Sequence, residues 1–270
     1  MIVNHGRARL AAREHGSGQP DVLLVHAGVT DQRSWSHLIG RLSTHARCLT
    51  FDARGFGRTE YEPEEGWSPV DDALAVLDGF GSARAVVVGA SMGGRTALDL
   101  TLSRPDRVSG LVLIGAAISG APAPTDLDDA ARALDEAGDA ALERGDLDEV
   151  NRIEAHLWLD GPLQAEGRVE GEARRLFLEM NAAALAAADP GGQADPPAAW
   201  DRLDEVGVPT LVLVGEHDLR HVRANARRVA ESVRAARLIE LDGVAHLPHL
   251  EGDQQTLAAI DEFVSAAASR

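Results

Sequence analysis

The sequence contains no lysine, a single cysteine and few aromatic residues. Its 26 basic residues are all arginines and stand against 43 acidic ones, which gives a formal net charge of −17. A chain this acidic is repelled by nucleic acid and by anionic membrane surfaces, so we expect neither as a partner. The lone cysteine, Cys48, cannot form an internal disulfide, and its apolar surroundings favour a buried thiol in a reducing compartment.

Long apolar stretches are also missing. The N-terminus lacks a basic segment followed by an apolar core of about 7–15 residues, the mark of a secretory signal peptide. No apolar run approaches the ~18 residues of a membrane-spanning helix. We therefore expect a soluble, cytoplasmic protein, and its 270 residues suffice for one α/β domain that carries an insertion.

What the sequence does contain is a series of short, nearly continuous apolar runs bounded by Gly, Asp or Pro. Runs without alternating polar residues are typical of strands that are covered on both faces of a parallel sheet. Helical patterns separate them, and an antiparallel hairpin is expected within the first 14 residues. We predict an α/β fold, a mostly parallel sheet of about eight strands with helices on both faces. The predicted strands are 22–26, 48–51, 85–89, 108–114, 209–215 and 237–241, and the predicted helices lie near 35–45, 69–80, 221–234 and 254–267.

The strand pattern stops after Gly115 and resumes only at Pro209. The residues between are rich in Ala, Asp and Glu, with apolar residues at helical spacing, and a Pro- and Gly-rich turn region closes them. We predict a helical lid over residues 117–198. It is inserted into an α/β core made of residues 1–116 and 199–270.

The strongest local motif is Gly-Ala-Ser-Met-Gly-Gly at residues 89–94, between a predicted strand and a predicted helix. A tight strand-to-helix turn lifts the central hydroxyl above the edge of the sheet, and the flanking glycines leave room for the backbone to approach closely. The bare pattern Gly-x-Ser-x-Gly is common by chance, so its position between strand and helix carries the argument. It predicts Ser91 as a nucleophile.

A serine hydroxyl needs a base within hydrogen-bond reach and a third group that orients the base. The strand that ends at residue 215 is followed by Glu216 and Asp218, and the next strand is followed by His246. Because the carboxyl ends of parallel strands meet at one edge of a sheet, these side chains are expected to converge with Ser91. We predict His246 as the base, with Asp218 or Glu216 as the orienting acid.

From about residue 8 to its end the chain resembles the α/β-hydrolases, in which the nucleophile, the acid and the histidine follow one another in the same order. The resemblance implies Asp218, the fourth residue of the segment 215–218, as the acid. Residues 51–59 read Phe-Asp-Ala-Arg-Gly-Phe-Gly-Arg-Thr and are similar to the family's Asp-x-Arg-Gly-x-Gly-x-Ser/Thr loop. In that loop the Asp, here Asp52, and the Arg are mainly structural.

The segment His26-Ala27-Gly28 resembles the family's His-Gly-x oxyanion motif, with Ala27 where glycine is usual. The resemblance implies that the backbone N–H groups of Gly28 and Met92 hold the oxyanion, with Val29 as the alternative to Gly28. His26 is expected to be structural. A second histidine near the predicted base, His249, is expected to be a helix-start or surface residue.

Large apolar residues near the predicted site are candidates for substrate binding. They are Trp35, which follows the oxyanion loop, and Leu157, Trp158 and Phe177 in the predicted lid. For each lid residue, simple packing of the lid against the core is the alternative.

The resemblance implies a serine hydrolase of the branch that holds 3-oxoadipate enol-lactonases and small carboxylesterases. Such an enzyme cleaves a small, mostly uncharged ester or lactone through an acyl-enzyme on Ser91, and it needs no cofactor and no metal. A carbon–carbon bond hydrolase, a haloperoxidase-like enzyme, or a small-molecule receptor with little turnover are the alternatives. The expected partner is a small-molecule substrate, and the chain is expected to be a monomer or homodimer.

Overall fold

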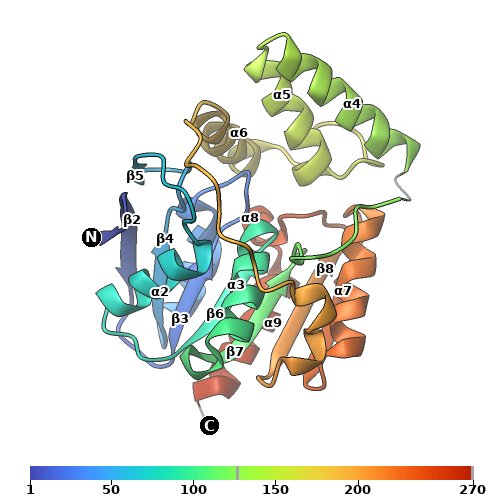
Figure 1. Cartoon of the computed structure of the whole chain (residues 1–270). Coiled ribbons are helices and arrows are strands. Elements are labelled where there is room, and N and C mark those ends of the chain that lie inside the picture. Colours follow the sequence, from blue (N-terminus) through green and yellow to red (C-terminus); the bar gives the residue numbers. More distant parts are fainter. Residues whose placement is uncertain (126–127, 269–270) are drawn as a thin grey trace.

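One twisted sheet forms the centre of the computed structural model, which describes residues 1–125 and 128–268 (Figure 1). Within these residues the strand order is β1-β2-β4-β3-β6-β7-β8-β9, and β5 pairs with β2. The strands from β4 to β9 along this order run parallel, whereas β1, β2 and β5 pair antiparallel. The strands are β1 Ile2–His5, β2 Ala8–His15, β3 Asp21–Val25, β4 Arg47–Phe51, β5 Glu60–Tyr61, β6 Ala85–Ala90, β7 Val108–Ile114, β8 Thr210–Gly215 and β9 Ala236–Leu241.

Helices cover both faces of the sheet. One face packs against α2 (Pro69–Gly79), α3 (Met92–Ser103) and α7 (Arg220–Ser232). The other packs against α1 (Ser36–Leu42) and α9 (Gln254–Ala268), with the short α8 (Pro248–Glu251) between them in space. Local signals explain where these helices begin: at α2, for example, the Ser68 hydroxyl accepts the Asp71 N–H and Pro69 occupies the first turn.

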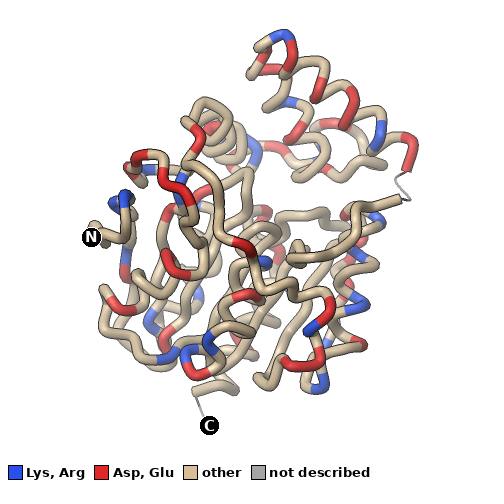
Figure 2. The backbone as a smooth tube through the Cα atoms, viewed as in Figure 1, with Lys and Arg blue, Asp and Glu red and all other residues tan. Residues whose placement is uncertain are grey.

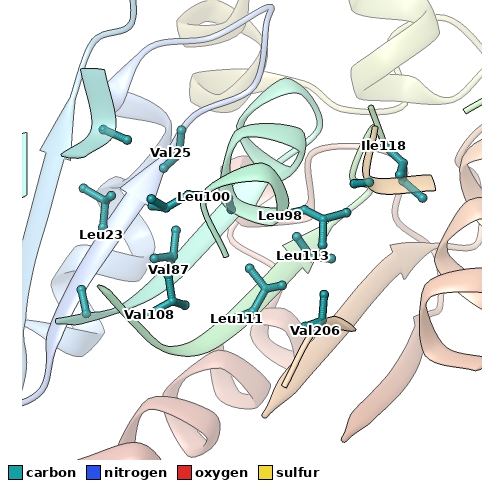
Figure 3. Close-up of a cluster of buried hydrophobic side chains, with 14 of the residues drawn as sticks. Leu23, Val25, Val87, Leu98, Leu100, Val108, Leu111, Leu113, Ile118 and Val206 are labelled. Carbon is teal, nitrogen blue, oxygen red and sulfur yellow. The ribbon is translucent and has the colours of Figure 1, made fainter. Parts of the chain in front are cut away.

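The core lies in two layers, one on each side of the sheet. Every residue of β3 and β6 is buried, as expected for runs that show no polar alternation. Burial also raises the pKa of the Cys48 thiol in β4 to about 12, so this residue stays an inert thiol at neutral pH. Figure 3 shows the layer under α3, where the labelled side chains are Leu23, Val25, Val87, Leu98, Leu100, Val108, Leu111, Leu113, Ile118 and Val206.

Between β7 and β8 the chain leaves the sheet and forms a separate helical layer beyond its carboxyl edge (Figure 1). We call residues 117–198 the insertion; residues 126 and 127 within it lie outside the described part of the chain. Figure 2 shows acidic residues spread along its outer helices, α4 and α5. The elements of the insertion are α4 Asp129–Glu143, α5 Leu147–Glu154, the π-helical segment η3 Ala155–Asp160 and α6 Gly171–Leu185.

The predicted α/β class is confirmed, and two details differ from the sequence expectation. The sheet has one more strand than the eight expected, the two-residue β5, which is too short to leave a pattern. The helix expected near residue 35 is preceded by a 3₁₀ turn, η1 (Gln32–Trp35), because the Asp31 carboxylate caps the Arg33 N–H three residues before α1. Among the described helices, none is both long and apolar enough to cross a bilayer.

Candidate active site

Ser91 occupies the one-residue turn between β6 and α3, with φ 50° and ψ −114°. A positive φ is strained for a residue with a side chain. The turn is possible because its neighbours are glycines: a Cβ on Gly89 would lie 2.2 Å from the Gly93 carbonyl oxygen, and a Cβ on Gly93 would lie 2.1 Å from that of Val25. The Ser91 N–H donates to the carbonyl of Ile114 in β7 at 2.9 Å, which fixes the turn to the neighbouring strand.

His246 and Asp218 form a buried, hydrogen-bonded pair. The His246 Nδ1–H donates to Asp218 Oδ2 at 2.8 Å, and the Leu219 N–H donates to the other carboxylate oxygen at 2.7 Å. The pairing places the imidazole proton on Nδ1 and makes Nε2 the acceptor. Nε2 is buried and has no hydrogen-bond partner among the residues that the structure describes.

Gly115, directly after β7, brings the serine turn and the His–Asp pair together. It follows Ile114, the residue that holds Ser91, and its φ is 51°. A Cβ on Gly115 would lie 2.9 Å from His246 Nδ1 and 3.0 Å from Asp218 Oδ2. The pair therefore packs against the strand end that anchors the serine turn, which places all three predicted residues at the carboxyl edge of the sheet.

Glu216, the alternative acid, takes a different position. Its carboxylate is exposed to solvent and accepts the Gly243 N–H at 3.0 Å. In the structure His246 therefore pairs with Asp218, whereas Glu216 bonds to the backbone at Gly243.

The predicted oxyanion loop faces the N-terminus of α3. A Cβ on Gly28 would come within 3.5 Å of the Met92 Sδ, so the two segments lie in van der Waals contact. The first intrahelical bond of α3 runs from the Arg95 N–H to the Ser91 carbonyl, and the Met92 N–H precedes it. The dipole of α3 adds to the partial positive charge there. The N-terminus of α3 is therefore suited to stabilise an anion, and the segment at Gly28 lies against it.

His26 and Asp52 are structural, which confirms the sequence expectation. The His26 Nδ1–H donates to the Ala27 carbonyl at 2.8 Å, and its Nε2 accepts the Ala53 N–H at 3.0 Å. Burial lowers the pKa of His26 and favours this neutral form. Asp52 accepts the Arg58 N–H at 2.8 Å and so closes its own loop.

A cavity of about 290 Å³ opens beside Met92, on the side of the sheet that carries α2 and α3. Arg95 and Gln193 provide polar groups, and the Arg95 guanidinium donates to the Gln193 side chain at 3.2 Å. The walls do not include Ser91, Asp218 or His246, so the cavity adjoins the predicted triad only at Met92, the residue after Ser91. Apolar lining residues are Val25, Phe51, Phe56, Trp67, Pro69, Met92, Ala184, Ala187 and Ala188.

Two of the predicted substrate-binding residues lie in η3 of the insertion, and one of them contacts the predicted base. The Trp158 ring lies over the His246 ring, with 4.7 Å between centroids and 44° between planes. Leu157, its neighbour in η3, is half-buried and lines a small cavity inside the insertion. Trp158 is therefore in direct contact with the predicted base, whereas Leu157 lines a cavity formed by insertion residues.

Trp35 and Phe177 require a correction, because both are 0% exposed in the core. Trp35 stacks on His249 with 4.2 Å between ring centroids, and Phe177 packs on the same side of the sheet. Neither lines the cavity beside Met92. A large apolar residue next to a motif packs inward as readily as toward a ligand, and the sequence carried no signal to separate the two.

His249 lies in the first turn of α8, the first of the two positions expected for it, and it is fully buried. Neither ring nitrogen has a partner among the described residues. Burial, and then the nearby His246 and His26, lower its pKa to about 3. His249 is therefore a neutral core residue at physiological pH.

Comparison with known proteins gives the class. A sequence model of the alpha/beta hydrolase family matches residues 22–260, and the chain belongs to that family. The 2-hydroxy-6-oxo-6-(2'-aminophenyl)hexa-2,4-dienoic acid hydrolase of Metapseudomonas resinovorans is 33% identical over 124 residues, 43% of this chain and 42% of the relative.

Solved structures agree over nearly the whole chain. A thermophilic esterase from Thermogutta terrifontis superimposes with a TM-score of 0.78 at 23% identity, covering 99% of this chain and 98% of that one. Est816, an N-acyl homoserine lactone degrading enzyme, superimposes with a TM-score of 0.74 at 25% identity, covering 98% and 100%. The fold is therefore shared along its full length.

Replacing His249 should make stability less sensitive to acid. Below the ordinary histidine pKa of 6.5 the unfolded chain binds a proton at His249 that the folded protein does not accept until about pH 3. Wild type therefore loses roughly 1.4 kcal/mol of unfolding free energy per pH unit in that window through this residue. We expect the His249→Leu variant to lack this contribution in urea unfolding at pH 7, 6 and 5. Parallel pH dependences of the two proteins would contradict the assignment.

Proposed function

We propose that this protein hydrolyses a small, mostly uncharged ester or lactone through an acyl-enzyme on Ser91. One observation carries the proposal: the His246 ring is held by Asp218 through Nδ1, its buried Nε2 has no hydrogen-bond partner among the described residues, and the ring packs against Gly115, which follows the residue that anchors the strained Ser91 turn. A histidine with a fixed tautomer and an open acceptor nitrogen is what a serine nucleophile needs.

In the proposed reaction the Ser91 hydroxyl attacks the substrate carbonyl and gives its proton to His246 Nε2. Asp218 stabilises the imidazolium that forms. The tetrahedral oxyanion accepts hydrogen bonds from the N–H groups of Gly28 and Met92, donors that contribute ~3–4 kcal/mol each in comparable sites. Val29 remains the alternative to Gly28. The imidazolium then protonates the leaving alcohol, and water repeats the sequence to release the acid.

The insertion acts as a lid in this proposal. Trp158 covers the face of His246, which would keep bulk water from the imidazole once substrate is bound. The acidic side chains of α4, such as Glu136 and Asp139, are exposed to solvent and serve solubility. We further propose that the protein works on its small molecule in the cytoplasm, as a monomer or homodimer, because its one thiol is buried and needs no oxidising compartment.

Two similarities bear on which bond of the substrate is cleaved, and they favour different candidates. The lactone-degrading activity named for Est816 supports ester or lactone cleavage, because that protein matches the whole chain. A carbon–carbon bond hydrolase is the second candidate, and it is favoured by the higher but shorter similarity to the Metapseudomonas resinovorans hydrolase. A panel of p-nitrophenyl esters, lactones and vinylogous diketones separates the two candidates.

Ser91→Ala should abolish turnover of p-nitrophenyl acetate and leave the circular dichroism spectrum and the unfolding midpoint close to wild type, since it removes one half-buried oxygen. A fluorophosphonate probe should label wild type at Ser91, as read by peptide mass spectrometry. Labelling at another serine, or normal turnover by the alanine variant, would overturn the nucleophile assignment.

Asp218→Asn should reduce kcat by about 10⁴-fold, as in the comparable triad change, because the amide favours the wrong histidine tautomer. Glu216→Gln is the matched control, two residues away in the same loop, and should change kcat by less than about threefold, the scale of a surface substitution. Steady-state kinetics on one ester test both. The reverse order of effects would show that Glu216 is the acid.

The cavity beside Met92 is proposed to hold the apolar chain of the substrate. Ala184→Phe places a ring in its wall, and it should raise KM for hexanoate and octanoate esters while KM for the acetate ester stays near wild type. Ala183→Phe on the exposed side of the same helix is the control and should change neither. If KM rises equally for all chain lengths, the cavity does not hold the chain.

A further inference from the structure

Arg168, in the insertion between η3 and α6, uses every hydrogen-bond donor it has. Its Nε–H donates to the Asp160 carbonyl at 2.7 Å, and one Nη2–H donates to the Leu159 carbonyl at 2.7 Å. The remaining groups donate to the Gly243 carbonyl at 2.9 Å and to both oxygens of the Glu251 carboxylate at 3.0 Å each. Five donors in a fixed plane therefore meet five acceptors.

These acceptors belong to two separate parts of the protein. The Leu159 and Asp160 carbonyls end η3, the segment that places Trp158 over His246. Gly243 and Glu251 flank the loop that carries His246. The partners of Arg168 in this loop lie 75 and 83 residues along the chain, so the contact is a cross-link between the insertion and the core.

Glu251 extends the cross-link to the backbone next to the predicted base. Its Oε1, which accepts from Arg168, also accepts the Ala245 N–H at 3.3 Å, and Ala245 directly precedes His246. Burial raises the pKa of the Glu251 carboxyl, and the hydrogen bond and charge of Arg168 oppose that rise. Without the arginine, the carboxylate would lose the group that favours its charged form.

We propose that Arg168 is a positioning residue for the reaction. It fixes the position of the His246 loop relative to the segment that carries Trp158, so that the imidazole and the indole ring over it move together. The pair is bidentate and shielded, with the two side chains 19% and 10% exposed, and this makes it strong enough to select one arrangement. Arg168 itself touches neither Ser91 nor the imidazole in any recorded contact among the described residues, and it acts through Glu251 and the backbone.

The chain supplies a matched control in Arg174. Its side chain is 18% exposed, close to that of Arg168, and it forms an ion pair with a buried carboxylate, Asp160, at 2.7 Å. Both arginines thus stabilise the same stretch of the insertion. In the described part of the chain Arg174 makes no contact with the 243–251 loop. Its substitution therefore shows the effect of lower stability of the insertion while the Arg168 cross-link is kept.

The experiment compares Arg168→Met and Arg174→Met in the full-length protein. A fluorophosphonate probe titrates the reactive Ser91 in each preparation, so that kcat is expressed per labelled site, and KM and the unfolding midpoint are measured in parallel. We expect Arg168→Met to lower the per-site kcat by at least about tenfold, because small misplacements of catalytic groups are costly. KM should change less than kcat. Arg174→Met should lower the unfolding midpoint with a per-site kcat near wild type.

Glu251→Gln preserves the shape and most hydrogen bonds of the cross-link but removes its charge, and it should give a smaller loss of per-site kcat in the same direction. It provides a readout if Arg168→Met does not fold. A per-site kcat equal to that of wild type in Arg168→Met would overturn the proposal. If Arg168→Met does not fold, the same result in Glu251→Gln would overturn it. So would equal losses in the Arg168 and Arg174 variants. The inference rests on the proposed function, and absent labelling of Ser91 in wild type would refute that function instead.

Discussion

At the carboxyl edge of the sheet, backbone segments pack closely against one another at glycine residues, where no side chain separates them. At Gly93 the start of α3 lies against the end of β3, and a Cβ there would be 2.1 Å from the Val25 carbonyl oxygen. At Gly215 the end of β8 lies against the loop before His246, and a Cβ would be 2.1 Å from the Ala245 carbonyl oxygen. Contacts this short cannot be relieved without moving main chain. Glycine at these two positions therefore allows the close packing that brings the Ser91 turn and the His246 loop to one edge of the sheet.

This dependence explains why the fold, and the sheet edge at which the proposed catalytic residues lie, could be predicted from the sequence. A parallel strand buried on both faces needs a continuous apolar run, and a strand end at the crowded edge needs glycine, so both constraints are visible as residue types. Ser91 directly follows the buried strand β6, Asp218 lies three residues after the buried strand β8, and His246 lies five residues after β9, which is partly exposed. The ends of these parallel strands lie at one edge of the sheet, so sheet geometry predicts that the three residues lie near one another. The two-residue β5 imposes no such constraint on its composition, and it could not be predicted.

Other features depend on side-chain direction, which a single sequence does not record. Trp35 and His249 stack on each other in the core, although each stands close in the sequence to predicted site residues. Phe177 packs inward from α6 for the same reason. Arg168 is one of six arginines in a strongly acidic segment, and its role depends on partners 75 and 83 residues away. Such contacts depend on three-dimensional packing, so the residue types can be read from the sequence but the residues that contact one another cannot.

The insertion illustrates how polar groups can fix a layer that has a modest apolar core of its own. Asp160 is 0% exposed and accepts the N–H groups of Gly167 and Val169 at 2.8 and 2.9 Å, in addition to its ion pair with Arg174. Apolar contacts tolerate sliding of one surface over another, whereas a buried carboxylate with all its partners in place has one satisfactory position. The N–H groups of Gly167 and Val169, which flank Arg168, bond to this carboxylate, and these two backbone bonds present Arg168 to the His246 loop independently of the Arg174 ion pair. Figure 2 shows acidic residues along the outer helices α4 and α5, and within the described residues the partners of Asp160 and Arg168 come from other segments, so the charge of the outer surface can change while these contacts are kept.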